Sequence, residues 1–180
     1  MQLSATAYCH CKLTTETMNK AIFLDRDGVI NSDDGLYYIF RPDDFVLTPR
    51  LGECLKALQD EGYLLIVVSN QGGVARGEYE RQDVETLNKL LQEKLQEYGV
   101  QITEFYICPH HPDYGKCLCR KPQPLMVQKT LARFNVNPAQ SYFIGDRETD
   151  IQTAAAAGVT GILVERNAGI EKAVKKIFRE

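Results

Sequence analysis

The sequence predicts an α/β protein built on a doubly wound parallel sheet. Short apolar runs alternate along the chain with segments that carry apolar residues at helical spacing. Apolar and polar residues do not alternate within these runs, as they would in a sheet with one face exposed to water. Helices are therefore expected to cover both faces of the sheet. Polar residues directly follow four of the runs. In open α/β sheets this is the edge at which ligands bind.

The order of the elements follows from the same pattern. Strands are expected at the apolar runs of residues 21–24, 64–68, 105–107, 142–144 and 160–164. Helices are expected at the helically patterned or alanine-rich segments of residues 50–60, 82–98, 125–134, 149–157 and 171–178. Residues 31–49 form the long irregular stretch, and in a compact domain such a loop is usually functional.

A chain of 180 residues suits one domain with a sizeable core. Residues 18–180 are expected to form this single domain. Residues 1–17 show no periodicity and are expected to be a disordered N-terminal extension, because Met18 directly precedes the first strand. Cys9-His10-Cys11 in this extension offers only a weak metal site, since a flexible segment holds its ligands poorly.

The composition excludes several function classes. Apolar residues make up 44% and charged residues 25% of the chain, as in an ordinary soluble globular protein. The formal net charge of −3 provides no attraction for a nucleic-acid backbone. No apolar run approaches the roughly 18 residues of a membrane helix, and residues 1–17 lack the apolar core of a signal peptide. We therefore expect a cytoplasmic monomer with no nucleic-acid or membrane partner.

Asp25 and Asp27 follow the first expected strand, two residues apart. A carboxylate can attack phosphorus to form an aspartyl-phosphate, and a second carboxylate can protonate the leaving oxygen and then activate water. Gly28 allows the backbone to turn sharply and approach a phosphate. The Asp-x-Asp-Gly pattern also occurs in calcium loops, but those need flanking helices, whereas an apolar strand precedes the motif here. A strand-ending turn with two surface acids is the simpler alternative.

Two further segments carry groups suited to phosphate. Ser69 and Asn70 follow the second expected strand, where a hydroxyl and backbone N–H groups could hold phosphoryl oxygens. Both residue types also serve as helix caps and turns. Lys121 could neutralise a transferring phosphoryl group, and Arg120 offers a bidentate fork for a second anion. Outside this context the two would be a solvated basic pair.

Asp146 and Asp150 follow the fourth expected strand. Magnesium prefers oxygen ligands and keeps several waters, so Asp25, the backbone carbonyl of Asp27 and Asp146 would make a small Mg²⁺ site. Asp150 is expected to cap or support this site. Asp146 could instead cap the following helix, a role that is compatible with binding the metal.

A second metal site is predicted within one loop. Three thiolates and one imidazole occur in it, which is the ligand set of a closed tetrahedral zinc site: Cys108, His110, Cys117 and Cys119. Because the protein fills all four positions, this Zn²⁺ would be structural and would hold the loop that carries Arg120 and Lys121. His111 is the competing histidine. Such clustered cysteines fit a reducing compartment better than a disulfide framework.

Together these motifs resemble the haloacid dehalogenase superfamily. Its four motifs match Asp25-x-Asp27, Ser69, Lys121 and Gly145-Asp146-x3-Asp150, and the resemblance covers nearly all of residues 20–167. The Cys-x-His and Cys-x-Cys-Arg-Lys-Pro elements resemble the branch of heptose-bisphosphate and histidinol-phosphate phosphatases. The resemblance implies a Rossmann-like core, catalytic Mg²⁺, structural Zn²⁺ and no large cap domain. The segments before Ser69 and Arg120 are indeed too short for a separate lid.

The resemblance also implies roles for individual residues. Asp25 would be the nucleophile, Asp27 the general acid and base, and Ser69 and Lys121 would stabilise the phosphoryl group. Arg120 would contribute to substrate recognition. The preference for His110 over His111 as zinc ligand rests partly on the resemblance. Other residues are expected to line the substrate or metal site: Asp33, Asp34, Gly35, Leu36, Asn70, Gln71, Gly72 and Arg147.

Within this branch the loops favour one substrate. Residues 24–31 and 70–77 resemble heptose enzymes, whereas residues 145–151 resemble histidinol-phosphate enzymes. We expect removal of the 7-phosphate from D-glycero-D-manno-heptose 1,7-bisphosphate, a small phosphorylated sugar of activated-heptose biosynthesis. Histidinol phosphate is the alternative substrate. Arg76 with Arg120 could bind the remote phosphate of the bisphosphate.

Two other classes of protein remain open. The fold could be a zinc-stabilised binding module without catalysis, although the complete set of catalytic residues argues against it. It could also be a polynucleotide end phosphatase, which the acidic net charge and the lack of a basic, aromatic surface stretch disfavour.

Overall fold

The computed structural model describes residues 18–179. The expected disorder of residues 1–17 and the Cys9-His10-Cys11 motif lie outside the described residues. Five parallel strands form one sheet in the order β3-β2-β1-β4-β5. The strands are β1 (Lys20–Leu24), β2 (Tyr63–Asn70), β3 (Glu104–Cys108), β4 (Tyr142–Gly145) and β5 (Thr160–Leu163). The predicted α/β class and parallel sheet are confirmed.

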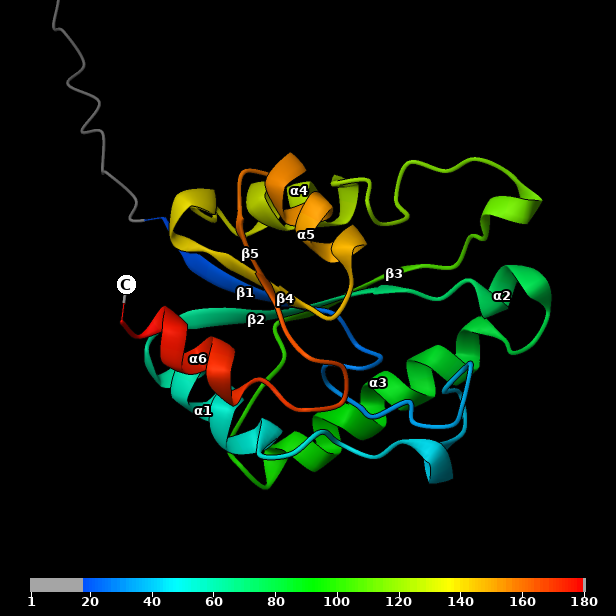
Figure 1. Cartoon of the computed structure of the whole chain (residues 1–180), viewed down its shortest axis with the longest axis horizontal. Helices are drawn as coiled ribbons and strands as arrows, with labels where there is room; N and C mark the ends of the chain where they lie inside the picture. The colour runs from blue at the N-terminus through cyan, green and yellow to red at the C-terminus, as the bar shows by residue number, and fades with distance from the viewer. Residues whose placement is uncertain (1–17, 180) are drawn as a thin grey trace, which may run out of the picture.

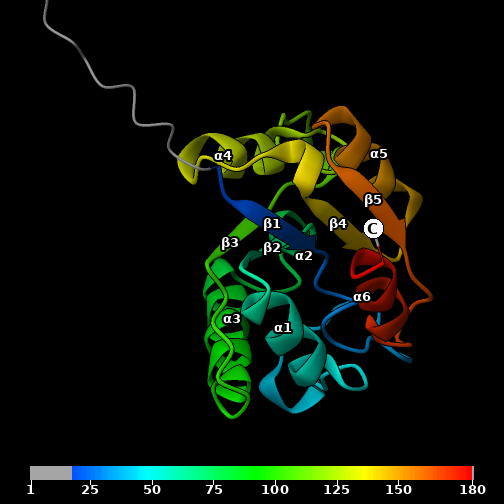
Figure 2. The same ribbon diagram turned by 90° about the vertical axis from the view of Figure 1, so that its left-hand side faces the viewer.

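Helices cover both faces of the sheet (Figures 1 and 2). One face carries α1 (Leu51–Asp60), α3 (Arg81–Gln96) and α6 (Glu171–Ile177), and the other carries α4 (Leu125–Arg133) and α5 (Glu148–Ala156). A four-residue helix, α2 (Gly73–Arg76), follows β2. Among residues 18–179 no segment forms a separate lid domain, so α2 and the loops that follow the strands enclose the carboxyl edge of the sheet.

Alternate residues of the central strands face the two apolar layers. Ile22 and Leu24 of β1 pack with α1, α3 and α6, whereas Ala21 and Phe23 pack with α4 and α5. All four are fully buried. Burial on both faces explains why these strands read as continuous apolar runs. The hydrophobic effect on both sides of the sheet therefore holds β1 rigidly in the centre.

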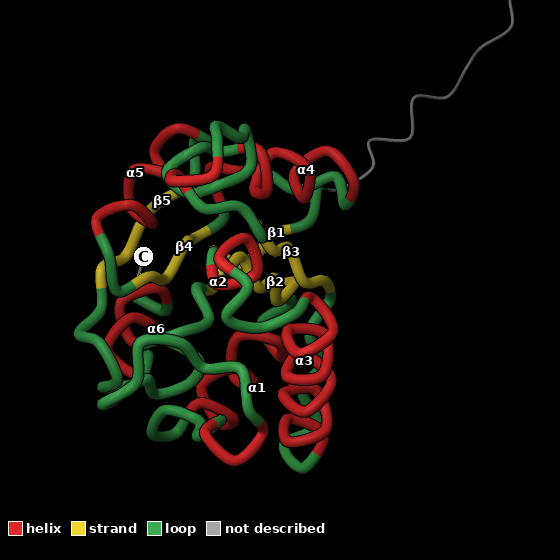
Figure 3. The backbone as a smooth tube through the Cα atoms, turned by 90° about the vertical axis from the view of Figure 1, so that its right-hand side faces the viewer, coloured by secondary structure: helices red, strands yellow, loops and turns green. Residues whose placement is uncertain are grey.

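The sheet order brings distant motifs to one edge. β1 pairs with β2 on one side and with β4 on the other. The chain thus fills one half of the sheet first and then returns to fill the other, which creates a switch point beside β1. Figure 3 faces this carboxyl edge, where α2 and the loops that follow the strands gather.

Two details differ from the expected elements. β2 continues through Ser69 and Asn70, because these residues pair with Ile107 and Cys108 of β3 and so extend the ladder. They are the last residues of the strand and do not follow it. The short helix α2 was not expected, since four residues are too few to show a helical period.

Candidate active site

Asp25 lies at the carboxyl end of β1, where its backbone N–H donates to the carbonyl of Ile144 on β4 (3.0 Å). The residue is 7% exposed, and its Oδ1 lies 2.8 Å from Lys121 Nζ. Burial raises the pKa of Asp25 to about 6; the charge of Lys121 opposes this rise and that of Asp150 adds to it. At neutral pH the carboxylate is therefore ionised and can act as a nucleophile.

The Lys121 ammonium is a buried cation held between acidic and neutral acceptors. Its Nζ lies 2.8 Å from Asp25 Oδ1 and 2.7 Å from Asp150 Oδ1, and it donates to the carbonyl of Val68 at 2.9 Å. Burial works to lower the pKa of Lys121, but the two carboxylates outweigh it and raise the pKa above 10.5. The ammonium remains charged and can neutralise a phosphoryl group bound beside Asp25.

The backbone of Lys121 is held by the side chain of Asn70. Asn70 Oδ1 accepts from the Lys121 N–H (3.0 Å), and Asn70 Nδ2 donates to the Lys121 carbonyl (3.2 Å). The two bonds use both polar atoms of the amide. Asn70, which the resemblance placed in the substrate site, therefore lines the cavity and also positions Lys121 across 51 residues of sequence.

The carboxylate of Asp27 is surrounded by hydrogen-bond donors. Arg26 binds it with a bidentate guanidinium, and Asn31 and Gln71 each donate one further bond. Gln71 Nε2 also donates to Ser69 Oγ at 2.7 Å, which leaves the Ser69 hydroxyl proton available for a phosphoryl oxygen. The Asp27 side chain is 25% exposed and lines the cavity.

The Gln71 amide is itself oriented by Tyr79. The Tyr79 hydroxyl donates to Gln71 Oε1 at 2.7 Å. Burial raises the pKa of Tyr79 to about 12, so the hydroxyl keeps its proton at neutral pH. With Oε1 occupied in this way, Gln71 presents its N–H₂ group to Asp27 and Ser69.

Three carboxylates converge in a group that could hold a cation. One oxygen each from Asp25, Asp146 and Asp150 lies within 4.8 Å of the others. Within residues 18–179, both oxygens of Asp146 are buried without a hydrogen-bond partner. Burial raises the pKa of Asp146. Asp146 Oδ2 lies 3.7 Å from Arg166 Nη1 and 3.9 Å from Arg147 Nε, at ion-pair distance. Because neither oxygen of Asp146 is used in a hydrogen bond, both can still serve as ligands of a magnesium ion.

Gly28 makes the approach to this group possible. Its φ is +89°, and a Cβ atom there would lie 2.7 Å from Asp146 Oδ2. Only glycine suits both the left-handed backbone and this close contact. Asp27 contributes no carboxylate oxygen to the group, and its backbone carbonyl remains the predicted ligand. Asp150 has the expected supporting contacts, to the Arg147 N–H (3.1 Å) and to Lys121, and also belongs to the group.

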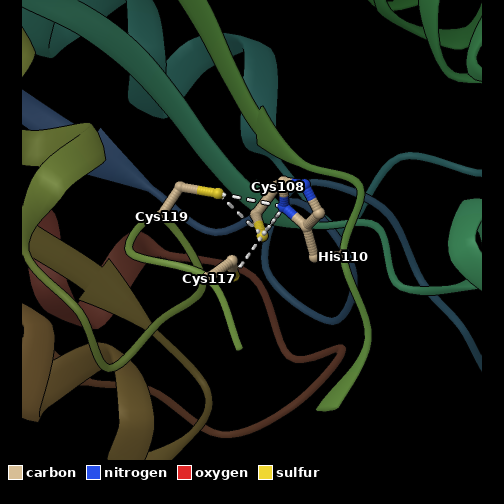
Figure 4. Close-up of side chains that lie close together, drawn as sticks. All are labelled: Cys108, His110, Cys117 and Cys119. Atoms are coloured by element: carbon tan, nitrogen blue, oxygen red, sulfur yellow. Dashed lines mark hydrogen bonds between the residues drawn. The ribbon is translucent and has the colours of Figure 1, made fainter. Parts of the chain in front are cut away.

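The four predicted zinc ligands lie together, Cys108 at the end of β3 and the other three in the loop that follows it (Figure 4). Cys108 Sγ is 3.1 Å from Cys119 Sγ and 3.7 Å from Cys117 Sγ. His110 Nδ1 is 3.3 Å from Cys119 Sγ and 3.5 Å from Cys108 Sγ. A tetrahedral site with Zn–S bonds of about 2.3 Å has edges of about 3.8 Å. The donor set therefore fits a zinc ion, and the Cys108–Cys117 distance matches this edge, whereas the Cys108–Cys119 distance is shorter and would have to lengthen when zinc binds.

This cysteine loop also contacts the active site. Arg120 Nη1 donates to the His110 carbonyl at 2.9 Å, so the guanidinium is held beside the loop. His111, the competing histidine, lines the cavity instead and approaches Gly72, at which a Cβ would lie 3.0 Å from its ring.

A cavity of about 510 Å³ opens above these groups. Its floor includes Asp25, Asp27 and Ser69. Four cationic side chains line it: Arg120, Lys121, Arg147 and Arg166. Three tyrosines form another part of its wall: Tyr37, Tyr38 and Tyr79. Four acidic side chains line it as well: Asp25, Asp27, Asp33 and Glu148. The volume suits a small molecule, and Arg120 and Arg147 are available to bind an anionic one.

Six of the residues that the resemblance assigned to substrate binding line the cavity: Asp33, Leu36, Asn70, Gly72, Arg120 and Arg147. Asp33 is already paired, because Arg166 Nε donates to its Oδ1 at 2.8 Å and Arg166 Nη2 to its Oδ2. Its carboxylate therefore anchors the loop at 33–36 to the segment after β5.

The other four do not contact the cavity in this structure. Asp34 accepts a bond from Asn167 (2.7 Å), and Gly35 is exposed. Gln71 lies behind Ser69, and Arg76 is exposed and hydrogen-bonds Tyr38. Their roles toward substrate remain predictions.

Three contributors were missed from the sequence: Arg26, Tyr79 and Arg166. Arg166 follows β5, so the rule that ligand groups follow strands would have found it if applied to the last strand. Arg26 lies between the predicted site residues Asp25 and Asp27, but nothing in the sequence indicated that its side chain is buried. Tyr79 is placed by the turn after α2, which was not expected.

The geometry agrees with comparisons to known proteins. A family model described as HAD-hydrolase-like matches residues 118–178. The chain is 44% identical over 158 residues to a D-glycero-beta-D-manno-heptose-1,7-bisphosphate 7-phosphatase of Haemophilus ducreyi, covering 84% of this chain and 86% of the relative. It is 39% identical to a D-glycero-alpha-D-manno-heptose-1,7-bisphosphate 7-phosphatase of Burkholderia mallei, covering 83% and 82%.

A solved structure has the same fold and a related sequence. It is the D,D-heptose 1,7-bisphosphate phosphatase from B. bronchiseptica, complexed with magnesium and phosphate. The TM-score is 0.77 at 31% identity, and the match covers 87% of this chain and 86% of the other. The resemblance to haloacid dehalogenase enzymes is thereby confirmed.

Proposed function

The chain belongs to the D-glycero-D-manno-heptose-1,7-bisphosphate 7-phosphatase family of haloacid dehalogenase-like hydrolases, and we propose that it removes the 7-phosphate from that sugar bisphosphate through an aspartyl-phosphate intermediate. It is a phosphoric monoester hydrolase. The observation that carries the mechanism is the buried contact of Asp25 with Lys121 on the floor of a cavity lined by cations.

In the first step Asp25 attacks phosphorus, and the bond from phosphorus to the sugar oxygen breaks. Asp27 gives its proton to that departing oxygen. Lys121 lies within contact of the nucleophile, and its charge offsets the negative charge of the phosphoryl oxygens. The Ser69 hydroxyl, whose oxygen accepts from Gln71, donates to one of these oxygens.

In the second step water attacks the phosphorus of the aspartyl-phosphate. The ionised Asp27 takes a proton from this water, and the bond from phosphorus to Asp25 breaks to release phosphate. Magnesium would be held by Asp25 and Asp146, with the backbone carbonyl of Asp27. When bound, it supplies positive charge to the nucleophile and to the phosphoryl oxygens.

Zinc is proposed at Cys108, His110, Cys117 and Cys119, where the thiolates require a reducing compartment. We propose the cytoplasm for that reason. None of the helices formed by residues 18–179 has both the length and the apolar character of a membrane span. Residues 18–180 are proposed to act as one domain and as a monomer, with residues 1–17 as an extension.

The bisphosphate substrate is supported by the distribution of cations. Lys121 is committed to the transferring phosphate by its contact with Asp25. Arg120 and Arg147 line the cavity as well, so either can pair with the phosphate at the far end of the sugar. Relatives named for the alpha and for the beta anomer are both similar to this chain, so both anomers are candidate substrates.

The decisive experiment compares phosphate release in Mg²⁺ from the two heptose 1,7-bisphosphate anomers and from histidinol phosphate. A higher kcat/KM for a bisphosphate supports the proposal, and the preferred anomer names the substrate. Preference for histidinol phosphate would move the protein to histidine biosynthesis with the same mechanism. The Asp25→Asn variant should be inactive; if it released phosphate equally well, the aspartyl-phosphate route would be wrong.

The remote phosphate can be located with two arginine variants. Arg120→Ala should raise KM for the bisphosphate far more than KM for p-nitrophenyl phosphate, which has no second phosphate. Arg76→Ala was expected to behave likewise, but Arg76 is exposed and bound to Tyr38. Equal losses on both substrates would remove the tested arginine from recognition of the remote phosphate.

A further inference from the structure

Arg26 is the one arginine among residues 18–179 whose side chain is fully buried, at 1% exposure. Removing a guanidinium from water costs several kcal/mol unless its hydrogen bonds are replaced. An apolar residue at this position would avoid that cost. The nucleophile Asp25 precedes Arg26 and the general acid Asp27 follows it, so the burial requires an explanation in terms of the site.

The Arg26 guanidinium is bound to the carboxylate of Asp27. Nε donates to Asp27 Oδ1 at 3.0 Å, and Nη2 donates to Oδ1 at 2.9 Å and to Oδ2 at 3.0 Å. Nη2 also donates to the carbonyl of Ile39 at 2.8 Å. The guanidinium is therefore held through Nε and Nη2, by the acid and by the wall of the cavity, which Ile39 lines. Its Nη1 is buried without a hydrogen-bond partner among the described residues.

Asp27 has two further contacts, and both are donors. Asn31 Nδ2 reaches Oδ1 at 3.1 Å, and Gln71 Nε2 reaches Oδ2 at 3.1 Å. Asn31 lies in the loop after β1, and Gln71 directly follows β2. The two donors therefore restrict rotation of the Asp27 carboxylate from two sides. The remaining open side of Asp27 faces the cavity, since its side chain is 25% exposed.

We propose that Arg26 is a positioning residue, which holds Asp27 for proton transfer to the leaving oxygen and does not itself touch substrate. This inference rests on the proposed phosphatase function. In the first step the bond from phosphorus to the leaving oxygen breaks as that oxygen takes the proton of Asp27. Arg26 aligns Asp27 with that oxygen, so its contribution to this first step exists only where the leaving group needs a proton.

The test is the dependence of kcat/KM on the leaving group, measured in Mg²⁺ with an alkyl phosphate and with 2,4-dinitrophenyl phosphate. The dinitrophenolate leaves without protonation. For Arg26→Met we expect kcat/KM for the alkyl phosphate to fall by about 10²–10⁴-fold, the range of general-acid catalysis. For 2,4-dinitrophenyl phosphate the loss should be within about threefold, because kcat/KM reports phosphorylation of Asp25 and not the later attack of water.

A double-mutant cycle separates positioning from general damage to the fold. If Arg26 acts through Asp27, then Arg26→Met should cost little more in the Asp27→Asn background. Arg26→Lys keeps the charge but loses the fork, and it replaces Arg26→Met in the cycle if the methionine variant fails to fold. It should show the same selective loss with the alkyl phosphate.

Thr48→Val is the matched control. Thr48 is buried in the same region and donates to the Val29 carbonyl at 2.7 Å without contacting Asp27. It should lower thermal stability and leave the leaving-group dependence unchanged. Equal losses on both substrates, or additive losses in the cycle, would overturn the inference. Absence of wild-type activity on the heptose 1,7-bisphosphates and on both phosphomonoesters would instead refute the proposed function.

Discussion

Asp25→Asn should stabilise the metal-free protein, although it removes an ion pair with Lys121. Asp25 is 7% exposed and its pKa is about 6 in the folded state, against an ordinary value of 3.8. Burial is the largest cause, and it outweighs the attraction of Lys121. Ionising this carboxyl therefore costs free energy in the folded protein. Asparagine has nearly the same shape and cannot ionise.

The magnitude and its sign follow from linkage. Between about pH 4 and pH 6 the folded state keeps a proton that the unfolded state releases, so the free energy of unfolding falls as pH rises through this window. At about 1.4 kcal/mol for each pH unit, the rise in pKa from 3.8 to about 6 corresponds to about 3 kcal/mol. The advantage of Asp25→Asn should be near zero at pH 4 and approach that value above pH 6.

The assay is urea unfolding of both proteins in chelator from pH 4 to pH 7.5, repeated with saturating Mg²⁺. Other groups titrate in both proteins, so the difference between the two unfolding free energies isolates Asp25. Mg²⁺ should stabilise the wild type more than Asp25→Asn, because binding to the folded state raises stability and the variant lacks one ligand.

Two results would refute this reasoning. A difference that stays flat from pH 4 to pH 7.5 would mean that the pKa of Asp25 is not raised by burial. A variant that becomes progressively less stable than the wild type as pH rises would mean that the ion pair with Lys121 exceeds the cost of burial.

Three other changes test separate parts of the site. Cys117→Ala should lower bound zinc and the melting temperature, because a structural zinc site contributes folding free energy; unchanged metal content would contradict the zinc assignment. Asn70→Ala should lower kcat by about 10-fold to 100-fold through loss of two bonds to Lys121, each worth about 1 kcal/mol or more, and an effect on KM alone would indicate direct substrate contact. Gly28→Ala places a Cβ 2.7 Å from Asp146 Oδ2 at a φ of +89°, so it should weaken Mg²⁺ activation; an unchanged Mg²⁺ titration would count against Asp146 as a ligand.

The strands and the zinc cluster could be predicted because their signals are local. The central strands β1, β2 and β4 contain continuous apolar runs because they are buried on both faces, whereas the edge strands β3 and β5 are partly exposed. The four zinc ligands are close in the sequence, so their spacing alone brings them within reach: Cys108, His110, Cys117 and Cys119. The limits of β2 were less certain, since its last two pairs depend on the presence of β3.

The groups around Asp25 were predicted from their positions at the ends of strands, and this prediction did not include which side chains contact one another. Asp25, Ser69 and Asp146 all stand at the carboxyl ends of strands, and parallel strands place those ends at one edge. A position at a strand end does not say which way a side chain turns. Asp27 was correctly placed at the edge, but its orientation toward Arg26 depends on Asn31, Gln71 and the surrounding burial.

The sequence by itself determined the fold class, the order of strands along the chain and the residue types available for phosphoryl transfer. The tertiary structure alone decided the pairs that join distant segments: Asn70 with Lys121, Gln71 with Asp27, and Asp33 with Arg166. The physical reason is the sheet order, which places β2 and β4 on either side of β1. The simultaneous packing of both apolar layers determines that order, and no local segment of the chain specifies it.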